Sequence, residues 1–141
     1  MKKKIIAMMC GVLVVGLFVF IMNNDKNHSP DEVLDDALTK LSKQDAYGFS
    51  RSVIDERFKD SNEAVLFYKQ DMEENPVANY MIIKSEMIDK DHYAFTTIKN
   101  FESEYTVKEP MDVKMIEGEW KVYISKKPLN EHEYEVVQHG K

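Results

Sequence analysis

Cysteine, glycine and histidine are scarce in this 141-residue sequence, and their scarcity excludes several kinds of chemistry. The single cysteine, Cys10, lies in an apolar run near the N-terminus, so the rest of the chain has no disulfide and no thiol nucleophile. Five glycines are too few for a glycine-rich phosphate loop, and no G-x-S-x-G motif is present. The four histidines, His28, His92, His132 and His139, lack the spacing of metal ligands. The sequence therefore offers no catalytic residue, no cofactor-binding residue and no metal site.

Positive charge is also scarce beyond the N-terminus. Residues 23–141 carry 16 of the 19 basic residues and all 25 acidic residues, a net charge of −9 against −6 for the whole chain. No cluster of lysine and arginine is interleaved with aromatic residues. A domain with this charge repels nucleic acid, and we exclude nucleic acid as a partner.

One long hydrophobic run, residues 5–22, contains 16 apolar residues, two glycines and no charge, and lysines occupy positions 2–4. As a helix, this run would extend about 27 Å, close to the hydrocarbon thickness of a bilayer. Its end lacks the small residues of a signal-peptidase site, and Cys10 comes too early for a lipid attachment site. We therefore predict an uncleaved signal-anchor over residues 1–22, a single transmembrane helix. The positive-inside bias places its N-terminus in the cytoplasm and the rest of the chain outside the cell membrane.

Residues 23–141 number 119 of the 141 residues, which is the size of one domain. The first of them, residues 23–29, form a polar tether. Ser29 suits the N-cap of a first helix, with Pro30 at its first position and Glu32 placed to complete a capping box. Apolar residues then recur at helical spacing as far as Leu41.

Two further helices are predicted from the same spacing. The second is expected over Ala46–Phe58, with Val53 on its inward face. The third begins after a cap at Asp60 or Ser61 and stops at an Asn-Pro pair.

The pattern changes to strands from Tyr80 onward. Four runs of strand-forming residues are present, over residues 81–88, 92–101, 105–116 and 120–124. Glu117 and Gly118 form a two-residue hairpin turn, and Pro110 indicates a bulge or an edge. Residues 127–141 form either an acidic tail or a charged edge strand. Helices followed by strands indicate an α+β fold with the helices on one face of an antiparallel sheet.

This order of elements resembles the NTF2-like (cystatin-like α+β) fold. The hairpin VKMIEGEWKVYI, residues 113–124, is similar to the closing hairpin of small membrane-anchored exported bacterial proteins of that family, which have no known function. The resemblance implies that residues 30–126 form about three helices packed on one face of a curved antiparallel sheet of four or more strands. The family also includes isomerases and dehydratases, but a resemblance in fold carries no catalytic residue over to this chain.

Two groups of residues are candidates for binding. Asp71, Glu73 and Glu74 lie in the last turn of the third predicted helix, where the helix dipole disfavours acids. They form either a solvated surface or a contact for a basic partner or a cation. The second group consists of apolar residues on the sheet, which form either ordinary core or the lining of a pocket between sheet and helices. Its members are Met87, Tyr93, Phe95, Met115 and Trp120.

The absence of catalytic motifs, the acidic charge and the anchor favour a membrane-tethered, extracytoplasmic, non-catalytic module that binds a protein partner, as an accessory or immunity-type protein. The alternative is a small-ligand-binding protein or an enzyme that uses an apolar cavity between sheet and helices. A buried, unpaired carboxylate or histidine in that cavity would favour the alternative. The oligomeric state is left open by the sequence.

Overall fold

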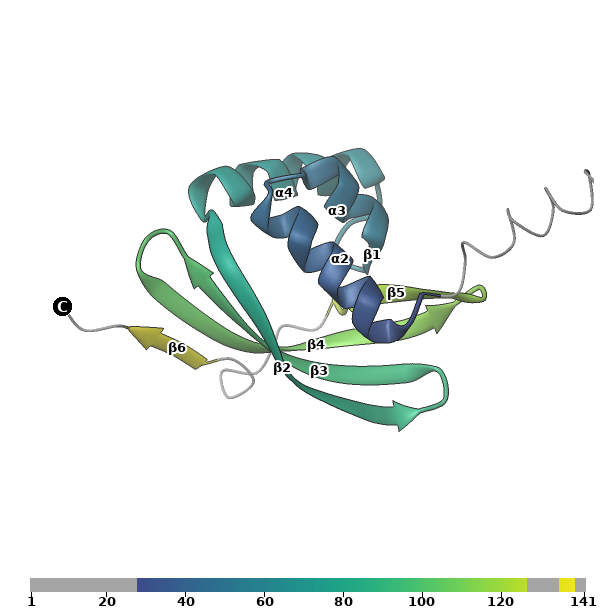
Figure 1. Ribbon diagram of the computed structural model, residues 1–141. Coiled ribbons are helices and arrows are strands. Elements are labelled where there is room, and N and C mark those ends of the chain that lie inside the picture. Colours follow the sequence, from purple (N-terminus) through teal and green to yellow (C-terminus); the bar gives the residue numbers. More distant parts are fainter. Residues whose placement is uncertain (1–27, 127–134, 139–141) are drawn as a thin grey trace, which may run out of the picture.

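The computed structural model describes residues 28–126 and 135–138 (Figure 1). The predicted signal-anchor at residues 1–22 and the first part of the tether lie outside these ranges. Within the described ranges, no helix combines the length and the apolar character needed to cross a membrane.

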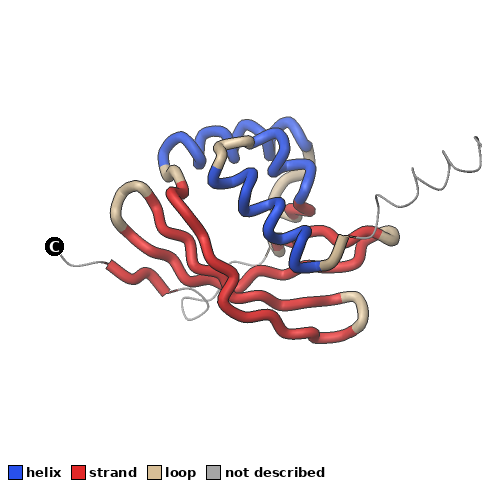
Figure 2. Tube along the Cα trace, viewed as in Figure 1, coloured by secondary structure: helices blue, strands red, loops and turns tan. Residues whose placement is uncertain are grey.

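The described residues form three helices and six strands. The helices are α2 (Pro30–Ser42), α3 (Ala46–Ser52) and α4 (Ser61–Glu74). The strands are β1 (Val53–Asp55), β2 (Val77–Asp89), β3 (His92–Phe101), β4 (Tyr105–Ile116), β5 (Glu119–Ile124) and β6 (Glu135–Gln138). The helices lie together on one face of the sheet (Figure 2), so the α+β class predicted from the sequence is confirmed.

Helix α2 begins as predicted. Ser29 is its N-cap, and the Ser29 hydroxyl accepts a hydrogen bond from the Glu32 backbone N–H at 3.4 Å. The Glu32 carboxylate in turn accepts a bond from the Ser29 N–H at 2.9 Å, which completes the capping box. Asp60 likewise caps α4 by accepting a bond from the Asn62 N–H at 2.8 Å.

The second predicted helix, Ala46–Phe58, is wrong beyond Ser52. Helix α3 ends there, and the chain continues as the strand β1, which pairs in parallel with β5. Val53 and Ile54 are β-branched and favour strands, and Val53 reaches a buried position opposite Val122. Pairing with a distant strand therefore outweighs the helical spacing of this segment. Because β1 is parallel to β5, the sheet is mixed rather than purely antiparallel.

The strand order is β1-β5-β4-β3-β2, and β6 also pairs with β4. Strand β4 is shared along one side: residues 112–116 pair with β5, and residues 105–108 pair with β6. Within the described ranges, residues 109–111 pair with β3 alone. Pro110, which has no N–H to donate, occupies the middle of this gap.

The core lies between the helices and the sheet. Its largest fully buried apolar side chains are Leu34, Leu38, Phe95, Val113 and Val122. The hairpin register expected from the sequence is confirmed, since Val122 is fully buried and Trp120 and Ile124 pack against the core.

Candidate functional site

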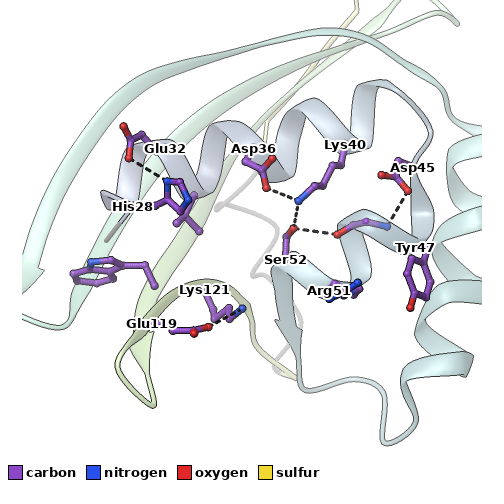
Figure 3. Close-up of a pocket in the computed structure, with 13 residues that line it drawn as sticks. His28, Glu32, Asp36, Lys40, Asp45, Tyr47, Arg51, Ser52, Glu119 and Lys121 are labelled. Carbon is purple, nitrogen blue, oxygen red and sulfur yellow. Dashed lines mark hydrogen bonds and ion pairs between the residues drawn. The ribbon is translucent and has the colours of Figure 1, made fainter. Parts of the chain in front are cut away.

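A groove of about 810 Å³ opens between α2, α3 and β5 (Figure 3). It is lined by His28, Glu32, Val33, Asp36, Lys40, Asp45, Tyr47, Gly48, Arg51, Ser52, Glu119, Trp120 and Lys121. Ionisable side chains from all three elements face this space. The groove therefore combines charged side chains with apolar surface, whereas the cavity considered from the sequence was apolar.

A chain of hydrogen bonds crosses the groove from α2 to α3 (Figure 3). Lys40 forms an ion pair with Asp36 and donates to the Ser52 hydroxyl at 2.7 Å. The Ser52 hydroxyl donates in turn to the Gly48 carbonyl at 3.0 Å. A serine beside a lysine is a known nucleophilic arrangement, but it requires a neutral amine that accepts the serine proton. Here the Lys40 amine donates to both the Asp36 carboxylate and the Ser52 hydroxyl, so this cluster is arranged to bind polar groups rather than to activate Ser52.

The other charges of the groove also have neighbours. Lys121 lies 3.4 Å from the Glu119 carboxylate on β5, and His28 lies 3.6 Å from Glu32. The Arg51 guanidinium lies 5.7 Å from the centre of the Tyr47 ring, within the range of a cation–π contact. The groove thus presents matched charges of both signs over a wide surface.

The hydrogen bond from the Ser29 backbone holds the pKa of Glu32 below its usual value, and the nearby His28 acts in the same direction. Glu32 is therefore a carboxylate at neutral pH. It keeps a negative charge at the α2 end of the groove.

The apolar group predicted from the sequence shares one face of the sheet. Met87 pairs with Tyr93 in register, and Met115 pairs with Trp120. The rings of Tyr93 and Trp120 meet edge to face at 5.5 Å, and Tyr93 stacks on Phe95 at 6.3 Å. Trp120 lines the groove, whereas Phe95 is 2% exposed in the core and Met87 is 63% exposed. The structure therefore distributes these five residues over the groove, the core and the open end of the sheet.

A buried carboxylate that the sequence reasoning missed lies beneath α4. The Asp55 side chain is 3% exposed and accepts bonds from Arg57 at 2.6 and 2.9 Å and from the Tyr68 hydroxyl. It borders a smaller pocket of about 220 Å³, together with Phe58 and Ala64. The short spacing of an acid and an arginine in D-x-R was the available signal, but it stood inside a segment that was expected to be helical.

The ionisation of this cluster follows from its contacts. Burial alone would raise the pKa of Asp55, but hydrogen bonds from Arg57 and Tyr68 hold it below its usual value. Burial, together with the hydrogen bond to Asp55, raises the pKa of Tyr68. The hydrogen bond to Asp55 raises the pKa of Arg57. Asp55 is thus a paired, ionised carboxylate, which ties β1 to α4 and to the loop between them.

His92 has a carboxylate partner, but not its sequence neighbour Asp91. Its Nε2 lies 2.7 Å from the Asp112 carboxylate on β4. Because Tyr93 faces the helices, His92 lies on the opposite face of the sheet and away from the groove. Asp112 lies on the adjacent strand, diagonal to His92, and this relationship is visible only once the register is known.

The acidic residues at the end of α4 do not line the groove. The Asp71 carboxylate accepts a bond from the Asn75 side chain at 3.1 Å, and the Asp71 backbone carbonyl accepts one from the Asn75 N–H at 2.7 Å. Glu74 accepts a bond from Gln70 at 2.8 Å. Glu73 is exposed, and the last turn of α4 contains no basic residue. The acidic end is therefore a surface separate from the groove.

No protein-family model and no curated protein matches the sequence. Solved structures do match in fold. A proposed NTF2-like transpeptidase from Campylobacter jejuni is 13% identical, with a TM-score of 0.51 over 70% of this chain and 100% of that one. A domain of unknown function with a cystatin-like fold from Nostoc punctiforme is 8% identical, with a TM-score of 0.52 over 69% of this chain and 75% of that one. The Delta 5-3-ketosteroid isomerase from Mycobacterium sp. is 10% identical, with a TM-score of 0.51 over 78% of this chain and 100% of that one.

Each of these structures matches this chain in fold, and their names differ in what they say of function. At such identities they show the fold and nothing of the activity. The fold of this chain is NTF2-like, as its helix-then-meander order and its closing hairpin indicated.

Proposed function

We propose that this NTF2-like chain is a membrane-tethered module that binds a protein partner outside the cell membrane and does not act as an enzyme. The observation that carries the proposal is the groove between α2, α3 and β5, most of whose ionisable side chains pair with one another. Catalysis requires groups aimed at one reacting point and poised to exchange a proton. A wide surface of matched charges instead suits the polar contacts of a protein interface.

The interior supports the same choice. The described residues contain no buried side-chain nitrogen or oxygen that lacks a hydrogen-bond partner. Asp55 is buried, but it is paired with Arg57 and Tyr68. A buried and unpaired carboxylate or histidine would favour an enzyme. Asp55 is not such a group, because it is paired.

The proposed signal-anchor determines where the domain would be held. Residues 5–22 have the length and the apolar character of a single membrane span, with positive charge before them and acidic charge after them. The domain begins a few residues after this run, so we propose that it works close to the outer surface of the cell membrane.

The groove can be tested with a photoreactive side chain. Arg51 is exposed and lines the groove, whereas Lys108 is exposed on β4 and does not line it. We expect Arg51→p-benzoylphenylalanine in the full chain to give a discrete protein adduct in native membranes, and Lys108→p-benzoylphenylalanine to give none at the same mass. Failure to form an adduct at Arg51, or the same adduct from both positions, would refute the groove as the contact.

The acidic end of α4 is proposed as a second contact. Asp71, Glu73 and Glu74 have no basic residue in the same helical turn to offset them. Exposed charges of this kind act mainly by accelerating the encounter with an oppositely charged surface. We therefore propose that a basic region of the partner approaches this end while the groove makes the closer contacts.

A small anionic ligand is the second candidate, and the contact between Lys40 and Ser52 favours it. A bound carboxylate or phosphate could take the place of Asp36 beside the Lys40 ammonium and accept a bond from Ser52. Such a ligand would raise the thermal midpoint of unfolding of the unaltered chain and would not change that of the Lys40→Gln variant. If no carboxylate or phosphate in a panel of anions raises the midpoint of the unaltered chain, the small-ligand candidate is refuted and the protein-binding proposal stands by itself.

A further inference from the structure

Among the residues that the structure describes, strand β2 forms a free edge of the sheet and has an unusual share of exposed apolar side chains. It is 13 residues long, stands last in the strand order, and extends with its turn beyond the helices (Figure 1). Of the nine large exposed apolar residues in the described ranges, four lie on this strand. They are Met81, Ile83, Met87 and Ile88, each 48–63% exposed. A long, apolar, unpaired edge is a template for another strand.

The sequence of β2 is complementary to itself when two copies run antiparallel about Ser85. Lys84 then stands opposite Glu86 of the second copy, and Glu86 opposite its Lys84. Ile83 meets Met87 in the same register. The side chains of Lys84 and Glu86 lie on one face of the strand, 3.2 Å apart, so the two copies would place four alternating charges together. Opposite charges and apolar pairs in facing positions are the contacts that stabilise neighbouring strands.

Neighbouring registers lack this match. If the two copies of β2 were centred on Lys84, the two Lys84 side chains would lie directly opposite each other, and centring on Glu86 would place the two Glu86 side chains opposite each other. Like charges in facing positions are destabilising. The pairing of β2 with β3 is regular from Lys84 to Met87. The register shifts on either side of this stretch, between Ile82 and Lys84 and between Met87 and Asp89. The regular stretch of β2 therefore contains the charge-complementary residues Lys84 and Glu86 and the centre at Ser85, and Ile83 lies at the shift beside it.

We propose that β2 pairs with β2 of a second copy of this chain, antiparallel and centred on Ser85, so that the two sheets join into one. The contact is isologous, with the same residues contributed by both copies. It uses the edge opposite to β1 and β5, so the groove remains open in the pair. The dimer does not depend on the function proposed for that groove.

Charge reversal gives a test with an internal rescue. In the full chain in detergent, Lys84→Glu sets four glutamates at the contact and Glu86→Lys sets four lysines. By sedimentation velocity over a range of concentrations, we expect each variant to dimerise about tenfold or more weakly than the unaltered chain. An equimolar mixture of the two variants should recover the dimer, because each Lys84→Glu strand then faces a Glu86→Lys strand. Lys69→Glu, an exposed reversal on α4, serves as the control and should change nothing.

Ser85 supplies a second measurement at the proposed two-fold axis. In a Cys10→Ala background, Ser85→Cys provides the single thiol of the chain. Facing Cα atoms in antiparallel strands are about 4.5–5.5 Å apart, within the range of a disulfide. We expect mild oxidation to give a covalent dimer from Ser85→Cys and none from the exposed helix position Lys69→Cys in the same background. A monomeric unaltered chain, a dimer unchanged by either reversal, or a mixture that fails to recover would overturn the proposal.

Discussion

Tyr68 on α4 donates a hydrogen bond from its hydroxyl to the Asp55 carboxylate on β1, and Arg57 binds the same carboxylate. The Tyr68 ring also packs edge to face on Phe49 at 4.8 Å. One residue thus joins α4 both to β1 and to α3.

Removing the Tyr68 hydroxyl should weaken the domain without disturbing its ring packing. We expect Tyr68→Phe to lower the free energy of unfolding by about 1–2 kcal/mol, since a hydrogen bond to a charged and buried group is lost. The measurement is urea unfolding followed by the fluorescence of Trp120, the one tryptophan of the chain. Tyr47 is 64% exposed, so Tyr47→Phe is the matched control and should cost little. Equal losses in the two variants would show that the bond to Asp55 is unimportant.

The same carboxylate predicts a dependence of stability on acid. The pKa of Asp55 is lower in the folded chain than its ordinary value, so its ionised form favours folding. This contribution is present above about pH 4, the ordinary value of an aspartate, and is lost as the pH falls through the lower folded pKa. Asp55→Asn should be less stable than the unaltered chain at neutral pH, and the difference between them should shrink on acidification. A difference that stays constant from neutral to acidic pH would contradict this assignment.

The turn between β4 and β5 should accept a stabilising substitution. Glu117 and Gly118 both have positive φ, 51° and 83°, the geometry of a type I′ turn. Asparagine adopts this backbone more readily than glutamate, so Glu117→Asn should raise the free energy of unfolding by about 0.5 kcal/mol. Gly118→Ala should lower it by about 1 kcal/mol or more. Thermal melts that rank the three proteins in any other order would show that the turn is not strained at these positions.

Much of the fold could be predicted because its signals are local. The cap at Ser29, the helical spacing after it and the Glu-Gly turn each act within a few residues, and all three appear as expected. Strand β1 was missed because its partner is far away in the sequence: Val53 pairs with Val122. A three-residue parallel strand has no local pattern of its own that separates it from a helix.

The candidate site was harder to predict for the same reason. The groove brings together α2, α3 and β5, and their contact is a result of the tertiary fold. Lys40 and Ser52 are ordinary surface residues in the sequence and become neighbours only when α3 folds back on α2. Trp120 is the exception among the apolar candidates, since it lines the groove. Its side of the sheet could be predicted because residues alternate between the two faces along β5.

Neutralising the acidic end of α4 should alter the rate of partner binding and not the fold. We expect Asp71→Asn, Glu73→Gln and Glu74→Gln together to leave stability unchanged or slightly raised, because acids oppose the dipole at a helix C-terminus. Adduct formation through the photoreactive side chain at Arg51 should become slower and less sensitive to salt.

Three exposed acids elsewhere, neutralised by Asp31→Asn, Glu63→Gln and Asp91→Asn, give a control of equal net charge. This control should retain the original rate and salt dependence. If both triple variants behave alike, or if neither differs from the unaltered chain, the acidic end is a solvated surface without a role in binding.

The central claim is that the NTF2-like domain is held at the outer face of the cell membrane, and protease access to intact protoplasts tests it most directly. An epitope tag placed after Lys141 should be removed by added protease, whereas a tag before Met1 should survive until the membrane is permeabilised. A C-terminal tag that is protected in intact protoplasts and cleaved only after permeabilisation would contradict the account.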